Sequence, residues 1–108
     1  MFVLHKEAPI DVVGHGVKRQ VLGYDDGLMM VRVMFAKGAT AALHAHPHRQ
    51  VTYVERGSFA VTINGTTTTV GAGDCFLVSP DVLHGASALE DGVLIDVFTP
   101  ARKDFIEP

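Results

Sequence analysis

The chain has 108 residues, which is enough for one compact domain with a single hydrophobic core and too few for two domains. Its formal net charge is -3 and it has no run of Lys or Arg, so nothing in it indicates nucleic-acid binding. Hydrophobic residues make up 47% of the chain, a high share for a small soluble protein, which predicts that a second copy covers part of the surface in a homodimer.

The N-terminal residues 1–10 begin with an apolar run that is interrupted at His5, Lys6 and Glu7. This run is too short and too polar for a signal peptide. No stretch approaches the roughly 18–20 continuous apolar residues of a membrane span. The single cysteine, Cys75, cannot form an intramolecular disulfide, which fits a reducing compartment. We therefore expect a cytoplasmic protein without a membrane partner.

Short runs of apolar and β-branched residues, separated by turns that contain glycine or proline, predict a chain of β-strands. We expect strands at residues 17–22, 28–35, 50–55, 58–63, 66–70, 75–78 and 93–98. The dipeptide Asn64-Gly65 has the composition of a two-residue hairpin turn. The threonine run 66–69 fits a half-exposed strand, because β-branched residues suit the pleat. No window shows a sustained helical period, so the sequence predicts an all-β fold, an antiparallel sandwich or barrel.

Three histidines fall at alternate positions in the stretch HAHPHRQ, at His44, His46 and His48. Residues two apart in a strand point to the same side, and Pro47 favours an extended conformation at His46. Neutral imidazole is the common ligand of zinc, iron, nickel and copper, so the pattern favours a metal site over an exposed, non-binding loop. His48 either touches a ligand at the rim of such a site or has a solvent-exposed structural role.

The spacing around these histidines resembles the first motif of the cupin family. Gly38 is followed by five residues, His44-x-His46, three residues, Gln50, six residues and Gly57, and Gln50 replaces the usual glutamate. The stretch from Gly73 to His84 resembles the second cupin motif.

The second motif is the weaker match. Its proline is displaced to Pro80, Asp81 replaces a glycine and Ala88 replaces an asparagine, which leaves the loop shape in doubt, whereas His84 is intact. The cupin resemblance implies a single-domain antiparallel jelly-roll barrel, flanked by an N-terminal segment 1–16 and a C-terminal tail 99–108. It also implies one divalent metal ion held by four residues: His44, His46, Gln50 and His84.

Gln50 gives the predicted site an unusual charge. Three imidazoles and an amide leave a divalent metal with its full charge, which makes it a stronger Lewis acid and a better anchor for an anion. The site also lacks the carboxylate of the two-histidine, one-carboxylate oxygenases. These properties favour non-redox chemistry on an acidic substrate. Gln50 is either a fourth ligand or a bystander to a three-histidine site.

The last predicted strand carries a second group of candidates. Asp96 interrupts an apolar run and is expected to be at least partly buried, which is costly for a carboxylate unless it is paired or functional. Phe98 by itself fits a core position. Arg102 lies six residues from the C-terminus, where a frayed, solvated tail is the simplest alternative to a functional role.

Nearly the whole chain resembles the pectin-degradation cupins of the KdgF type, above all in HPHRQVTYV and DVFTPARKDF. That family converts 4,5-unsaturated monouronates, released from pectin and alginate by lyases, to linear 4-deoxy-5-keto uronates. The resemblance implies metal ligation by the four motif residues and catalytic roles for Asp96, Phe98 and Arg102. In the expected mechanism Asp96 moves protons, Arg102 pairs with the substrate carboxylate and Phe98 forms a wall of the site.

Two other functions remain open for such a chain. One is a non-catalytic cupin that binds a metal or a sugar acid, and the other is a different enzyme, such as a cupin dioxygenase or another sugar-acid isomerase. The sequence does not distinguish Ni, Zn, Fe, Mn and Co as the metal, because imidazole-rich sites accept several. It also does not rank the possible unsaturated uronates.

Overall fold

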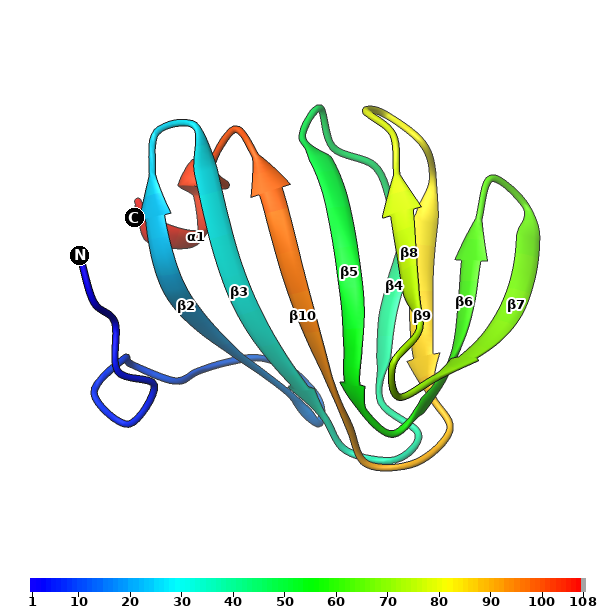
Figure 1. The fold of residues 1–108 in the computed structure, drawn as a ribbon. Helices are drawn as coiled ribbons and strands as arrows, with labels where there is room; N and C mark the ends of the chain where they lie inside the picture. The colour runs from blue at the N-terminus through cyan, green and yellow to red at the C-terminus, as the bar shows by residue number, and fades with distance from the viewer. Residues whose placement is uncertain (108) are drawn as a thin grey trace.

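The structure is a computed structural model that describes residues 1–107, so that Pro108, the end of the expected tail 99–108, lies outside it. Two antiparallel sheets face each other (Figure 1). The six-stranded sheet has the order β1 (Asp11–Gly14), β2 (Val17–Asp25), β3 (Leu28–Phe35), β10 (Gly92–Thr99), β5 (Arg49–Arg56), β8 (Cys75–Val78). The four-stranded sheet has the order β4 (Thr40–His44), β9 (His84–Ala88), β6 (Ser58–Ile63), β7 (Thr66–Gly71). A short helix, α1 (Lys103–Ile106), follows β10.

The seven expected strands all form, and the all-β jelly-roll prediction is confirmed. The Asn64-Gly65 turn is confirmed as well, because both residues have positive φ, 48° and 83°, as a type I′ hairpin requires. The threonines of β7 are all exposed rather than half-exposed, since β7 is an edge strand with a partner on one side only. Residues 11–14 of the flanking segment form β1, which pairs with β2.

Three strands were not expected: β1, β4 and β9. The last two are composed largely of alanine, glycine, serine and histidine, which have little intrinsic strand preference. They form because each pairs with the other, and β9 pairs with β6 on its second side. Their small side chains let the backbones of β4 and β9 lie together, and this pairing places His44 opposite His84.

Most of the hydrophobic core lies between the two sheets. Phe35 from β3 and Phe59 from β6 meet edge to face with ring centroids 5.3 Å apart. In β5 the inward residues Gln50, Thr52 and Val54 are buried, and the residues between them are exposed. Because buried and exposed positions alternate strictly along β5, the amide of Gln50 and the hydroxyl of Thr52 point into the interior.

Apolar side chains are exposed on the outer face of the six-stranded sheet, for example Met30, Val51, Tyr53 and Leu77. They are compatible with the expected homodimer, which stays a prediction. Within residues 1–107, no helix has the length and apolar character needed to cross a membrane.

Gly85 fixes the distance between β4 and β9 next to the histidines. A Cβ at this position would lie 2.8 Å from the carbonyl oxygen of Ala41 and 3.1 Å from the amide nitrogen of Leu43. We expect Gly85→Ala to lower the free energy of unfolding by about 1–3 kcal/mol, because the strands must separate. Thermal denaturation would measure this. Gly71→Ala is the control, since its Cβ would meet nothing closer than 4.0 Å; equal melting temperatures for the two variants would contradict the account.

Candidate metal centre and active site

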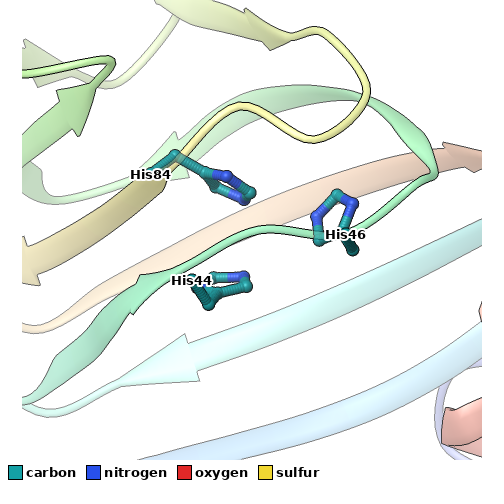
Figure 2. Close-up of side chains that lie close together, drawn as sticks. All are labelled: His44, His46 and His84. Atoms are coloured by element: carbon teal, nitrogen blue, oxygen red, sulfur yellow. The ribbon is translucent and has the colours of Figure 1, made fainter.

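Three of the predicted ligands converge at one end of the two sheets. His44 ends β4, His84 begins β9, and His46 lies in the loop that leads to β5. One ligand nitrogen from each histidine lies within 4.8 Å of the other two, as the close-up of the three side chains illustrates (Figure 2). His46 and His84 are buried, and His44 is exposed. The arrangement is a cluster that could hold a metal ion.

The backbone indicates the tautomer of the three rings. The Nδ1 atom of each ring lies within hydrogen-bond distance of a backbone carbonyl oxygen, which can only accept a proton. Each Nδ1 therefore carries the proton, and each Nε2 keeps the lone pair that a metal needs. The distances are 2.7 Å from His44 to Ala42, 3.0 Å from His46 to His48 and 2.8 Å from His84 to Val82.

In two of the three rings, no hydrogen-bond donor faces the lone pair of Nε2. In the part of the chain that the structure describes, the buried Nε2 of His84 has no hydrogen-bond partner. The Nε2 of His46 lies 2.9 Å from Oε1 of Gln50, so that two lone pairs face each other. Burial lowers the pKa of both His46 and His84, which favours the neutral, ligating form. A divalent cation would satisfy all of these atoms, so the residues fit the metal that the cupin motifs imply.

The orientation of the Gln50 amide follows from a hydrogen-bond chain to Asp96. The Thr52 hydroxyl donates to Oδ1 of Asp96 at 2.6 Å and accepts from Nε2 of Gln50 at 2.8 Å. The amide nitrogen of Gln50 therefore faces Thr52, and its oxygen faces His46. The amide oxygen of Gln50 thus points toward the histidines, and Asp96 is joined to Gln50 through Thr52.

Thr52 was not among the predicted site residues. It lies two residues after Gln50 on the same strand and directly opposite Asp96 in the register of β5 and β10. The two-residue spacing from Gln50 was a usable signal, because it puts both side chains on one face. The pairing with Asp96 needed the register between two strands more than forty positions apart, which the sequence does not show.

Asp96 is partly buried, as expected for a polar residue in this strand. Loss of hydration raises its pKa to about 6, although the hydrogen bond from Thr52 and the positive charge of Arg102 act in the opposite direction. A carboxyl group with a pKa near neutrality can both take and give a proton. The alternative for Asp96, a carboxylate fully satisfied by an arginine or by backbone amides, does not match these contacts.

We expect Thr52→Val to lower kcat about tenfold for a reaction in which Asp96 transfers a proton. The bound metal should be retained. Valine has the shape of threonine without its hydroxyl, so Asp96 would lose its closest hydrogen bond, worth about 1.5–3 kcal/mol for a charged acceptor. Steady-state kinetics and metal analysis would measure the two effects. Thr52→Ser keeps the hydroxyl and should restore most of the rate; a Thr52→Val enzyme as active as the wild type would remove Thr52 from the site.

A cavity of about 230 Å³ opens beside this cluster. His44, Gln50 and Asp96 line one part of it, and Phe98 and Arg102 line another. Drug-sized ligands occupy pockets of about 300–1,000 Å³, so this cavity suits a smaller molecule of monosaccharide size rather than a polymer. Five of the seven predicted site residues thus line one cavity, and His46 and His84 lie beside His44.

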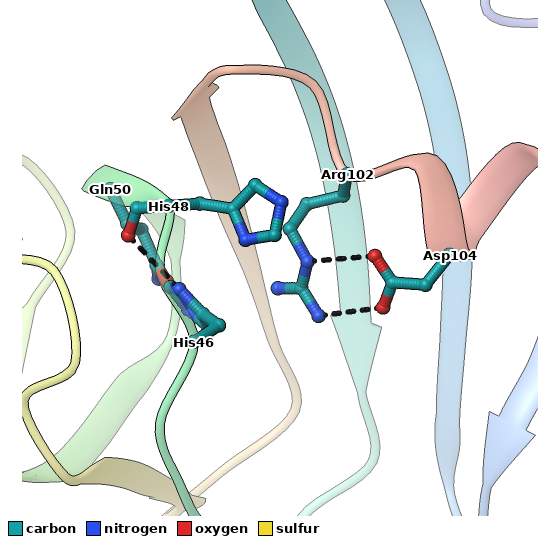
Figure 3. Close-up of polar contacts among 5 residues, drawn as sticks. All are labelled: His46, His48, Gln50, Arg102 and Asp104. Atoms are coloured by element: carbon teal, nitrogen blue, oxygen red, sulfur yellow. Dashed lines mark hydrogen bonds and ion pairs between the residues drawn. The ribbon is translucent and has the colours of Figure 1, made fainter.

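Arg102 is held against the cavity and is not part of a frayed tail. Its side chain is 12% exposed, and its guanidinium group forms a two-point ion pair with Asp104, at 3.1 Å from Nε and 2.9 Å from Nη2 (Figure 3). This pairing lowers the pKa of Asp104. The guanidinium carbon of Arg102 also lies 5.1 Å from the centre of the Phe98 ring and 4.2 Å from that of Phe105. Asp104 and Phe105 had not been predicted.

Comparison with known proteins identifies the family of this chain. The family model described as a cupin domain matches residues 31–98. The pectin degradation protein KdgF of Dickeya dadantii (strain 3937) is 42% identical over 107 residues, which cover 97% of each chain. This chain belongs to the KdgF-type cupins.

Solved structures place this KdgF-type cupin among close relatives. The structure of KdgF from Halomonas sp. superposes with a TM-score of 0.93 at 36% identity and covers 97% of each chain. An RmlC-like cupin from Shewanella frigidimarina superposes with a TM-score of 0.94 at 46% identity, over 96% of this chain and 94% of its own. A predicted oxalate decarboxylase from Thermotoga maritima shares only the fold, at 17% identity.

The departure of this KdgF-type cupin from the second cupin motif does not disturb the loop. Asp81 replaces a glycine, and it adopts the left-handed conformation, with φ 65°, that aspartate tolerates better than most residues. Its backbone N–H donates to the carbonyl of His46 at 2.8 Å. The loop between β8 and β9 therefore keeps its turn and is joined to the loop that carries His46.

His48 contributes through its backbone in this KdgF-type cupin. Its carbonyl oxygen accepts the Nδ1–H of His46, which fixes the orientation of that ring. The imidazole of His48 is partly buried, with its centroid 5.5 Å from that of His46, and it lies on the side of Arg102 (Figure 3). His48 thus has a structural role through its backbone, its ring is half-buried, and a role of that ring at the rim of the cavity stays a prediction.

Proposed function

We propose that this KdgF-type cupin opens the ring of 4,5-unsaturated monouronates derived from pectin or alginate and yields linear 4-deoxy-5-keto uronates. The observation that carries the proposal is the position of Asp96, a carboxyl group with a pKa of about 6 that lines a monosaccharide-sized cavity and is joined through Thr52 to Gln50, whose amide oxygen faces His46. The 42% identity to the Dickeya dadantii pectin degradation protein supports the substrate class.

The reaction redistributes one proton and requires no oxidant and no added water. The hydroxyl on C1 loses its proton, C1 becomes a carbonyl, and the bond from C1 to the ring oxygen breaks. The ring oxygen remains on C5 as an enol or enolate, C4 gains a proton, and C5 becomes a ketone. In this proposal Asp96 takes the first proton and delivers one to C4, which its near-neutral pKa permits in both directions.

His44, His46 and His84, with Gln50 as a fourth ligand, would hold one divalent metal ion. When bound, such an ion acts as a Lewis acid that stabilises negative charge developing on substrate oxygens. Because Gln50 is neutral, the protein does not cancel any of the ion's charge. The position of Asp96 would also depend on that of the ligand set, because Gln50 and Asp96 are both hydrogen-bonded to Thr52.

Arg102 would bind the carboxylate of the substrate. A guanidinium group has five N–H donors, and Asp104 uses one on Nε and one on Nη2. The remaining N–H groups on Nη1 and Nη2 form a second edge that can donate hydrogen bonds to another carboxylate. The Phe98 ring lies 5.1 Å from the guanidinium carbon of Arg102 and lines the cavity together with Asp96, where it would keep water from the reacting carbons.

Identification of the product tests this proposal. Metal-loaded protein would be incubated with an unsaturated monouronate in an oxygen electrode, and the product would be analysed by NMR. The proposal predicts a linear 4-deoxy-5-keto uronate and no oxygen uptake. Oxygen consumption would favour a dioxygenase, and tight binding of the uronate without a product would favour a non-catalytic sugar-acid-binding cupin; either result would contradict the proposal.

A further inference from the structure

A second arginine lines the same cavity. Arg19 lies in β2, where inward and outward positions alternate, and its side chain shares the cavity wall with His44, Asp96 and Arg102. Its neighbour Lys18 is exposed. The two residues carry the same charge on one strand, but only Arg19 is directed to the site.

Arg19 and Arg102 share one aromatic ring. The guanidinium carbon of Arg19 lies 3.8 Å from the centre of the Phe105 ring, and that of Arg102 lies 4.2 Å from the same centre. A planar guanidinium stacks well on an aromatic face, so Phe105 positions both groups. Both cations therefore contact the same ring at the wall of one cavity.

The hydrogen-bonding capacity of the two arginines is unequal. Arg102 is paired with Asp104, whereas Arg19 has no ion pair to any of residues 1–107. Its Nε atom is buried, and among the described residues it has no hydrogen-bond partner. A buried donor without a partner is costly, and an oxygen of a bound ligand would satisfy it.

The local charge points to an anion as that ligand. The Asp104 carboxylate is paired directly with Arg102, and Asp11, opposite Arg19 on β1, acts on Arg19 through its charge without forming an ion pair to it. The guanidinium group of Arg19 therefore has no direct counter-ion among residues 1–107, and in a partly water-excluded site this favours a negatively charged ligand. A carboxylate matches the planar donor edge of a guanidinium better than a hydroxyl does.

We propose that Arg19 is a second carboxylate-binding residue, which donates hydrogen bonds to the acid group of the sugar alongside Arg102. This inference rests on the proposed function, because it takes a sugar acid as the substrate. Arg19 sets the preference for uronates over neutral sugars, and it acts in binding rather than in proton transfer.

Calorimetric titration of the metal-loaded protein with D-galacturonate tests this role apart from catalysis. Arg19→Gln should weaken binding about 10- to 100-fold, the effect of losing a hydrogen bond to a charged group. With an unsaturated monouronate, KM should rise by a similar factor while kcat changes less than about twofold, as expected for loss of an interaction that the ground state and the transition state share. Arg19→Lys should give an intermediate affinity.

Lys18→Gln is the matched control, since it removes the same charge one residue away and should bind like the wild type. Melting temperatures of all variants would show whether they fold; if Arg19→Gln does not, the affinity of Arg19→Lys decides. Wild-type affinity in the Arg19 variants, or no measurable galacturonate binding by the wild type, would overturn the inference. Arg19-dependent binding without ring opening would instead overturn the proposed function and leave the anion site standing.

Discussion

Asp96→Asn is expected to lower kcat for ring opening by about 10²- to 10⁴-fold, the range that a positioned acid or base contributes. Asparagine keeps the shape of the side chain and can still accept the hydrogen bond from Thr52, which now measures 2.6 Å to the Asp96 carboxylate. It cannot take or give the proton that the reaction moves. The metal content and the melting temperature should therefore stay close to the wild-type values, and steady-state kinetics would show the loss in kcat.

Glu90→Gln provides the matched control for that change. It also removes one carboxylate charge, but Glu90 is exposed in the turn between β9 and β10, at the end of the sheets opposite the site (Figure 1). Its kcat should equal that of the wild type. A fully metal-loaded Asp96→Asn protein with wild-type kcat would show that Asp96 takes no part in the reaction.

His84→Ala is expected to abolish stoichiometric metal binding. Even substitutions of residues that only orient a metal ligand cost about 10- to 100-fold in affinity, so loss of a ligand should exceed about 100-fold. Metal that binds the folded state raises stability by linkage, about 2.7 kcal/mol at a concentration 100 times Kd, and this gain should disappear in the variant. Metal titration and thermal denaturation with and without metal would measure both effects.

His48→Gln serves as the comparison for His84→Ala, because it removes a nearby imidazole whose backbone carbonyl, not its ring, supports His46. It should bind the metal with affinity close to that of the wild type. Wild-type metal affinity in His84→Ala, or equal losses in the two variants, would contradict the assignment of the ligands.

Most strands and the candidate metal site could be predicted from the sequence because both show in short-range patterns. Short runs of apolar and β-branched residues between turns predicted seven strands, and the spacing of His44, His46 and Gln50 indicated a metal site. The roles of His84, Asp96, Phe98 and Arg102 were assigned through the family resemblance. In the structure Asp96, Phe98 and Arg102 line one cavity, and His84 lies beside His44, which lines it too.

Features that arise from pairing between distant segments could not be predicted. β4 and β9 have weak intrinsic strand preference and form through each other. Thr52 meets Asp96 through strand register. Arg19 reaches the site because β2 folds against the helix that carries Phe105, which brings together residues from opposite ends of the chain. The guanidinium group of Arg102 is paired with Asp104, and this contact depends on the turn into α1.

The most direct test of the account follows the ultraviolet absorbance of the conjugated alkene of an unsaturated monouronate, after subtraction of spontaneous ring opening. Metal-loaded wild type, metal-stripped wild type and metal-loaded Asp96→Asn would be compared at equal concentration. The account predicts rapid loss of absorbance with the metal-loaded wild type alone. No acceleration with any divalent metal, or equal acceleration by the metal-stripped protein, would contradict it.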